Sequence, residues 1–218
     1  MGQNILYFHT GNNEQQSLKA LLIEHFATFR QWTLCSEEPF VDSEVLMHYL
    51  EQHTYLPEDF EHLDKELLDA LVAEFIMYCE SFTHTQHLLE LLDPFVKKRY
   101  YESSTQMVLA THDDLFIRLW SYIVQGRSFK DDQAFDGDYK VGFLTQTQCQ
   151  LLREKIETYF GNRQTIRNQA WTQEELELFQ KSPQRVVNLH PKSLGLECAL
   201  VAIESALYNK KELIIAIE

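Results

Sequence analysis

Histidine, cysteine and acidic side chains near position 84 are of the types that bind transition metals. His84 and His87 are three residues apart, and Cys79 and Glu80 stand about one helical turn upstream. Residues three apart share one face of a helix, so two imidazoles can ligate one ion if a third ligand comes from elsewhere. No residue at a fixed spacing supplies that ligand, so we expect ordinary half-buried histidines, with no metal site and no cofactor.

The loop Asp131–Asp138 contains the oxygen ligands that calcium prefers, and its spacing can be compared with the EF-hand pattern. If Asp132 is the first residue of the loop, Ala134 stands at the third position, where a ligand is needed, and Phe143 stands where the bidentate glutamate belongs. This spacing argues against calcium. A solvated acidic loop or a contact with a partner is the better interpretation.

Other polar groups do not form a recognisable catalytic pattern. The chain has no Gly-x-Ser-x-Gly elbow and no cysteine and histidine signature, so no catalytic residue is predicted. His48 and His53 are five residues apart and fit no ligand motif. The segment His9–Asn12 offers one glycine where a phosphate loop has several, which favours a plain turn. Asp113, next to His112, is most simply a helix cap.

Acidic residues are concentrated in one segment of the chain. Residues 37–93 contain 15 acidic residues and one basic residue, Lys65, and the rest of the chain has 18 of each. The whole net charge of −14 therefore lies in this segment. Such a field repels nucleic acid and anionic membranes and attracts a basic protein surface. The alternative is a solvated helical face that only keeps the protein soluble.

Several features favour a cytoplasmic protein. The N-terminus lacks a basic flank followed by an apolar run, and Leu6 stands where a myristoylation motif needs Ser or Thr. The apolar stretch 71–78 carries Glu74 and is too short for a membrane span. Reduced, buried thiols are the expected state of four widely spaced cysteines in apolar surroundings. These are Cys35, Cys79, Cys149 and Cys198.

The spacing of apolar residues predicts the helices and strands in the first half of the chain. The run 4–10 is a strand, and a helix over about 14–32 follows an Asn cap. Asp42 or Ser43 caps a second helix. After Pro57 comes an acidic helix, on which the apolar positions make one buried stripe while the acids Glu61, Asp64, Asp69 and Glu80 project elsewhere. The stretch 84–92 is predicted to be helical until Pro94.

The second half is predicted mainly from its caps. A helix starts at Asp113 or Asp114 and ends at Gly126, and a polar loop fills 127–139. Residues 141–144 enter a helix with a Thr145 and Gln148 capping box and a stop at Gly161. Three further features are expected: a second capping box at Thr172 and Glu175, a buried helix over 194–208, and a terminal strand over 212–218.

The first and last strands are expected to pair in one sheet. The predicted fold class is therefore α+β and mainly helical, with several amphipathic helices and a small sheet that includes both terminal strands. Residues 1–218 are expected to form a single compact domain, with 94–112 as the place for any sub-division.

Three segments of the second half resemble the ordering in the uncharacterised bacterial YfbM-like family. They are Asp113–Gly126, Val141–Ile156 and Ala199–Glu218, and the stretch from the start of the first to the end of the last covers about half of the chain. The shared motifs are caps and apolar helices, so the resemblance implies an α+β fold and no known reaction. The chain departs from the family pattern in its acidic first half and its central loop.

These observations favour a binding protein over an enzyme. In character, though not in motif, the chain resembles the acidic cytoplasmic immunity proteins that neutralise bacterial nuclease toxins by covering them. The expected partner is a basic protein, drawn in by charge steering. The candidate partner-binding residues are Glu58, Asp59, Glu61, Asp64 and Glu66. The alternative is an enzyme or metal-binding protein with a His, Asp and Glu site that includes His84 and His87.

Overall fold

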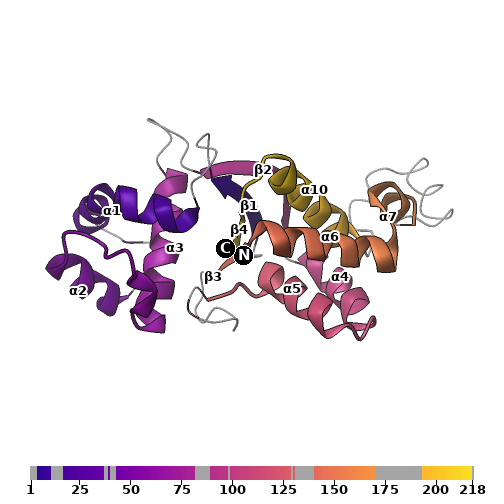
Figure 1. Cartoon of the computed structure of the whole chain (residues 1–218), viewed down its shortest axis with the longest axis horizontal. Coiled ribbons are helices and arrows are strands. Elements are labelled where there is room, and N and C mark those ends of the chain that lie inside the picture. Colours follow the sequence, from indigo (N-terminus) through magenta and orange to yellow (C-terminus); the bar gives the residue numbers. More distant parts are fainter. Residues whose placement is uncertain are drawn as a thin grey trace.

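A four-stranded antiparallel sheet runs through the middle of the molecule (Figure 1). Its strands are β1 (Asn4–Thr10), β2 (Leu89–Lys97), β3 (Lys140–Leu144) and β4 (Leu213–Ile217), and their order across the sheet is β2-β1-β4-β3. The computed structural model describes residues 4–10, 17–36, 39, 43–81, 89–97, 99–128, 130, 140–169 and 193–217. The first and last of these ranges therefore contain the two central strands.

One layer of helices covers the sheet face that carries Leu6, Phe8 and Ile214. This layer contains α1 (Leu18–Cys35), α2 (Glu44–Gln52), the short 3-10 helix η1 (Phe60–His62) and α3 (Lys65–Ser81). The hydroxyl groups of Ser17 and Ser43 accept backbone hydrogen bonds at the starts of α1 and α2. Alternation along the strands sends every second side chain to this face.

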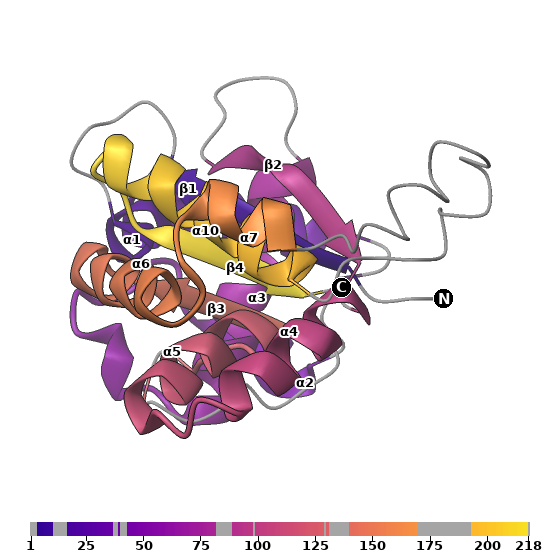
Figure 2. The same cartoon turned by 90° about the vertical axis from the view of Figure 1, so that its right-hand side faces the viewer.

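The second layer covers the opposite face, which carries Ile5, Tyr7 and Ile215. Figure 2 looks onto this layer. It contains α4 (Arg99–Leu109), α5 (Asp114–Val124), α6 (Gln146–Phe160), α7 (Arg163–Gln169) and α10 (Leu194–Tyr208). The sheet is thus buried on both sides, which explains why β4 is apolar at all five positions.

Several sequence predictions are confirmed. β1 pairs with β4 from Ile5 opposite Ile217 to His9 opposite Leu213, so the terminal strands share one sheet in a mainly helical α+β fold. The helix over 194–208 has the predicted bounds. The Thr145 and Gln148 capping box is present at the start of α6. Asp113 and Ser43 are the caps of their helices, and Gly126 and Gly161 have positive φ angles.

Three predictions are wrong, and one helix was not predicted. The end of the predicted helix 84–92 belongs to β2, where Pro94 is tolerated because β2 is an edge strand. Residues 141–144 form β3 instead of entering a helix, because the run pairs with β4. Helix α1 starts after Ser17 and not after an Asn cap. Helix α4 was not predicted at all, since its sequence is polar except where it packs on the core.

Two acidic side chains of α3 are buried, although Asp69 was expected to face solvent. Asp69 is 3% exposed and accepts a hydrogen bond from the Ser128 hydroxyl at 2.8 Å, and Glu74 is fully buried. Cys35 is exposed, whereas Cys79, Cys149 and Cys198 are buried as expected, and all four are free thiols. Within the described ranges, no helix is both long and apolar enough to span a membrane.

Candidate protein-binding surface

The five predicted partner-binding residues lie on one continuous stretch that runs from the connection after α2 into the first turn of α3. Glu58, Asp59, Glu61, Asp64 and Glu66 are all exposed. Two apolar side chains attach this stretch to the first layer, since Leu56 is 5% exposed and Phe60 is 1% exposed. We call these five acidic residues the acidic stretch.

Local hydrogen bonds give the acidic stretch a defined backbone. Phe60 N–H donates to Pro57 O at 3.1 Å, and Leu63 N–H donates to Phe60 O at 3.0 Å. The carboxylate of Asp64 then accepts from Glu66 N–H at 3.0 Å, at the first turn of α3. Buried apolar groups hold the turn, and its carboxylates are therefore presented to solvent on an ordered segment.

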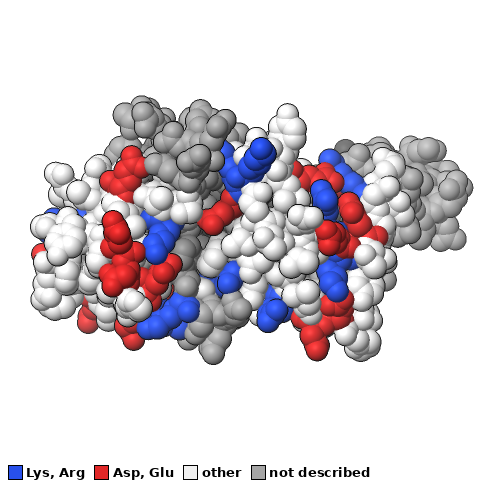
Figure 3. Space-filling view, in the orientation of Figure 1, with Lys and Arg blue, Asp and Glu red and all other residues white. Residues whose placement is uncertain are grey.

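Basic groups flank the acidic stretch without neutralising all of it. Lys19 Nζ forms an ion pair with Glu61 at 3.2 Å, and Lys130 Nζ donates to Leu63 O at 2.9 Å. No ion pair joins Glu58, Asp59 or Glu66 to the rest of the described chain. Figure 3 shows acidic side chains gathered over the layer of α1, α2 and α3, with basic side chains beside them. Three carboxylates are thus available to a partner.

Sequence reasoning missed an exposed aromatic side chain beside the acidic stretch. Tyr55 is 73% exposed and lies between the end of α2 and Glu58. Val45, at the start of α2, is also exposed. The only signal in the sequence is that Tyr55 falls outside the helical spacing of the apolar positions, next to Pro57.

The predicted histidine groups have structural roles where the structure describes them. His53 stacks on Tyr49 with ring centroids 4.1 Å apart, and His48 contacts the Gln52 side chain at 2.9 Å. His84 and His87 lie outside the described residues, as do the loop Asp131–Asp138 and the second capping box. Among the residues that are described, no three His, Cys, Asp or Glu side chains converge on a metal site.

The buried thiols are unsuited to nucleophilic catalysis at neutral pH. Burial raises the pKa of Cys149 and of Cys198 to about 12, and it raises the pKa of Cys79 as well. The reactive form of cysteine is the thiolate, which these pKa values leave almost unpopulated. The three cysteines therefore act as small apolar core residues.

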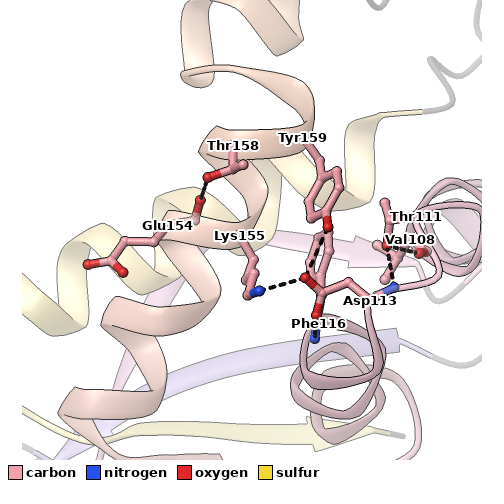
Figure 4. A network of polar contacts seen from close by, with 8 residues as sticks. All are labelled: Val108, Thr111, Asp113, Phe116, Glu154, Lys155, Thr158 and Tyr159. Atoms are coloured by element: carbon pink, nitrogen blue, oxygen red, sulfur yellow. Dashed lines mark hydrogen bonds and ion pairs between the residues drawn. The ribbon is translucent and has the colours of Figure 1, made fainter.

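Asp113 lies at the centre of a polar network between α5 and α6 (Figure 4). Its carboxylate accepts from Lys155 Nζ at 2.5 Å, from Tyr159 Oη at 3.0 Å and from Phe116 N–H at 2.9 Å. The hydrogen bond to Asp113 raises the pKa of Lys155 and of Tyr159 above their ordinary values. A lysine that acts as a nucleophile or general base needs a lowered pKa, and a carboxylate general base needs a raised one. The pKa of Lys155 is shifted the other way, as is that of Asp113, so the network fits a structural link between α5 and α6.

Comparison with known proteins adds no assignment. No family model, no curated protein and no solved structure matches this chain. The resemblance of the second half to the YfbM-like family therefore stays a prediction.

Proposed function

We propose that this protein binds a basic protein surface through the acidic stretch and inhibits that partner by covering it. The class of protein that we propose is the immunity proteins of bacterial toxin systems. The observation that carries the proposal is the exposure of all five carboxylates on one ordered segment. Three of them, those of Glu58, Asp59 and Glu66, have neither an ion pair nor a hydrogen bond within the described chain. A basic nuclease is the partner class with the complementary charge.

The charge distribution supports this function through the kinetics of association. A net charge of −14, all of it from residues 37–93, attracts a basic protein and repels nucleic acid and anionic lipid. We therefore expect rapid association at low salt and a marked loss of rate as salt rises. We also propose a cytoplasmic location, since free thiols stay reduced there.

The test is capture of basic proteins from a lysate of the source cells with the tagged protein at low salt and then at raised salt. The test variant is E58Q/D59N/E66Q, which changes the three carboxylates of the acidic stretch that have neither an ion pair nor a hydrogen bond within the described chain. The matched control is E102Q/E154Q/E157Q, which removes three exposed carboxylates from the second layer. Both variants change the net charge by the same amount.

We expect the wild type and the control to retain the same basic protein, and E58Q/D59N/E66Q to lose it. A captured enzyme should be inhibited by the wild type in a purified assay. Equal loss from both variants would mean that binding depends on net charge alone. Unchanged binding by E58Q/D59N/E66Q would show that the acidic stretch only keeps the protein soluble.

A further inference from the structure

Three aromatic side chains lie in the last turn of α2 and just beyond its C-terminal end. They are Tyr49, His53 and Tyr55, and we call them the aromatic ledge. The rings of Tyr49 and His53 are nearly parallel, with an interplanar angle of 14°, and His53 Nδ1 lies 3.0 Å from Tyr49 O. Tyr49 is 8% exposed and Tyr55 is 73% exposed, so the ledge runs from the core to the surface.

Tyr55 lies near Tyr49 in space as well as in sequence. Burial raises the pKa of Tyr49, and electrostatic repulsion from Tyr55 raises it further. The next residue, Leu56, is 5% exposed, so a buried side chain holds the backbone beside the exposed ring of Tyr55. A tyrosine loses little side-chain entropy on binding because it has only two main torsions, and exposed rings of this kind often dominate binding energy.

The residues around the aromatic ledge are acidic. Glu51, Glu58 and Asp59 are exposed and lie within four residues of Tyr55 in sequence. Arg30 is engaged with the backbone at the end of α2, where its Nη2 donates to Glu51 O at 3.3 Å. Its side chain therefore satisfies helix carbonyls, and the carboxylates beside Tyr55 stay available.

We propose that Tyr55 is the anchor for an arginine side chain of a basic protein partner. A planar guanidinium can stack on the exposed tyrosine ring while its N–H groups donate to the carboxylates of Glu58 or Asp59. A lysine ammonium has no planar face to stack and no fork to match a carboxylate. The partner that we propose is thus a protein surface that carries an exposed arginine. This inference rests on the proposed function of the acidic stretch.

The probes for the test are two labelled peptides, an alternating Gly-Arg dodecamer and the same peptide with Lys in place of Arg. Binding is measured by fluorescence anisotropy at low salt. We expect the wild type to bind the arginine peptide roughly two- to fivefold more tightly than the lysine peptide, from stacking at an exposed site. Y55A should bring this ratio close to one, and Y55F should keep it, because the ring and not the hydroxyl group stacks.

A second exposed tyrosine provides the control. Tyr208, on the second layer, is 88% exposed, and Y208A should leave the ratio unchanged. The inference is overturned if the wild type shows no preference for arginine, or if Y55A keeps the preference. E58Q/D59N should weaken the binding of both peptides, and that of the arginine peptide more, because it removes the acceptors of the guanidinium N–H groups. Failure of that variant to weaken either peptide would count against the acidic stretch itself, whatever Tyr55 does.

Discussion

Asp113 accepts a hydrogen bond from Lys155 at 2.5 Å and thereby joins the start of α5 to α6. The same carboxylate caps α5 by accepting from Phe116 N–H. Hydrogen bonds from Lys155 and then from Phe116 N–H hold the pKa of Asp113 at about 2, below its ordinary 3.8. The folded state therefore favours the charged form of Asp113.

The ion pair between Asp113 and Lys155 should make the stability of the folded protein depend on pH. A lowered pKa contributes stability above pH 3.8, the value in the unfolded chain, and this stability is lost as the pH falls through about 2. Asn also caps helices, so D113N keeps the cap and loses only the charge. We expect D113N to unfold at lower urea concentration than the wild type at pH 5, with the difference closing as the pH falls to 2. A difference that stays constant with pH would contradict the ion pair.

The hydroxyl groups of Tyr7 and Tyr101 should be energetically coupled. They lie 2.5 Å apart in the core between β1 and α4, and burial raises both pKa values well above 10.0. Y7F or Y101F alone leaves one buried hydroxyl without a partner, which costs about 1–3 kcal/mol of unfolding free energy. The double variant removes both hydroxyls and should cost less than the sum. Additive costs in a double-mutant cycle from urea unfolding would refute the coupling.

Glu212 should show the opposite pH dependence from Asp113. Burial raises its pKa above 4.5, although its carboxylate accepts a hydrogen bond from Leu18 N–H at the start of α1. A raised carboxyl pKa means that stability is greatest below the unfolded pKa of 4.5 and is lost as the pH rises through the folded pKa. E212Q keeps an acceptor for Leu18 N–H without the charge.

We therefore expect the melting temperature of E212Q, relative to the wild type, to increase between pH 4 and pH 7. Thermal unfolding followed by circular dichroism measures this difference directly. The exposed residue Glu102 offers a control, since E102Q should show no such trend. A relative melting temperature that falls with rising pH would mean that the charged form of Glu212 is stabilising.

Residue types near helix ends were enough to predict the helix caps, because a cap depends only on neighbouring residues in the chain. The capping box at Thr145 and the cap at Asp113 need only neighbouring backbone N–H groups, so their residue types are sufficient. β2 differs, because Leu89–Lys97 becomes a strand only by pairing with β1, a partner about 80 residues away in the chain. The α4 helix likewise depends on tertiary packing, since residues such as Tyr101 bury its one apolar face.

Only part of the candidate surface could be predicted, because its charge can be read from the sequence whereas the burial of each residue depends on tertiary packing. Charge is visible in composition, and Glu58 and Asp59 are exposed as a turn after Pro57 would suggest. Burial of single residues depends on what packs against them. Asp69 is therefore buried although it stands among exposed acids, and Tyr55 is exposed although aromatic residues are usually in the core.

Gly142 should be intolerant of any side chain, because β3 passes directly over α5. A Cβ atom at this position would lie 2.1 Å from Tyr122 O, a backbone atom that cannot move without shifting α5. We expect G142A to lower the unfolding free energy by about 1–3 kcal/mol or more in urea titrations, as overpacking does in other cores. G195A is a graded comparison, since its Cβ would meet the Ser104 hydroxyl at 2.9 Å and two Tyr101 atoms at 3.0 and 3.1 Å, a lesser overlap for which we expect a smaller loss. If G142A were as stable as the wild type, β3 and α5 would have to lie further apart than the structure has them.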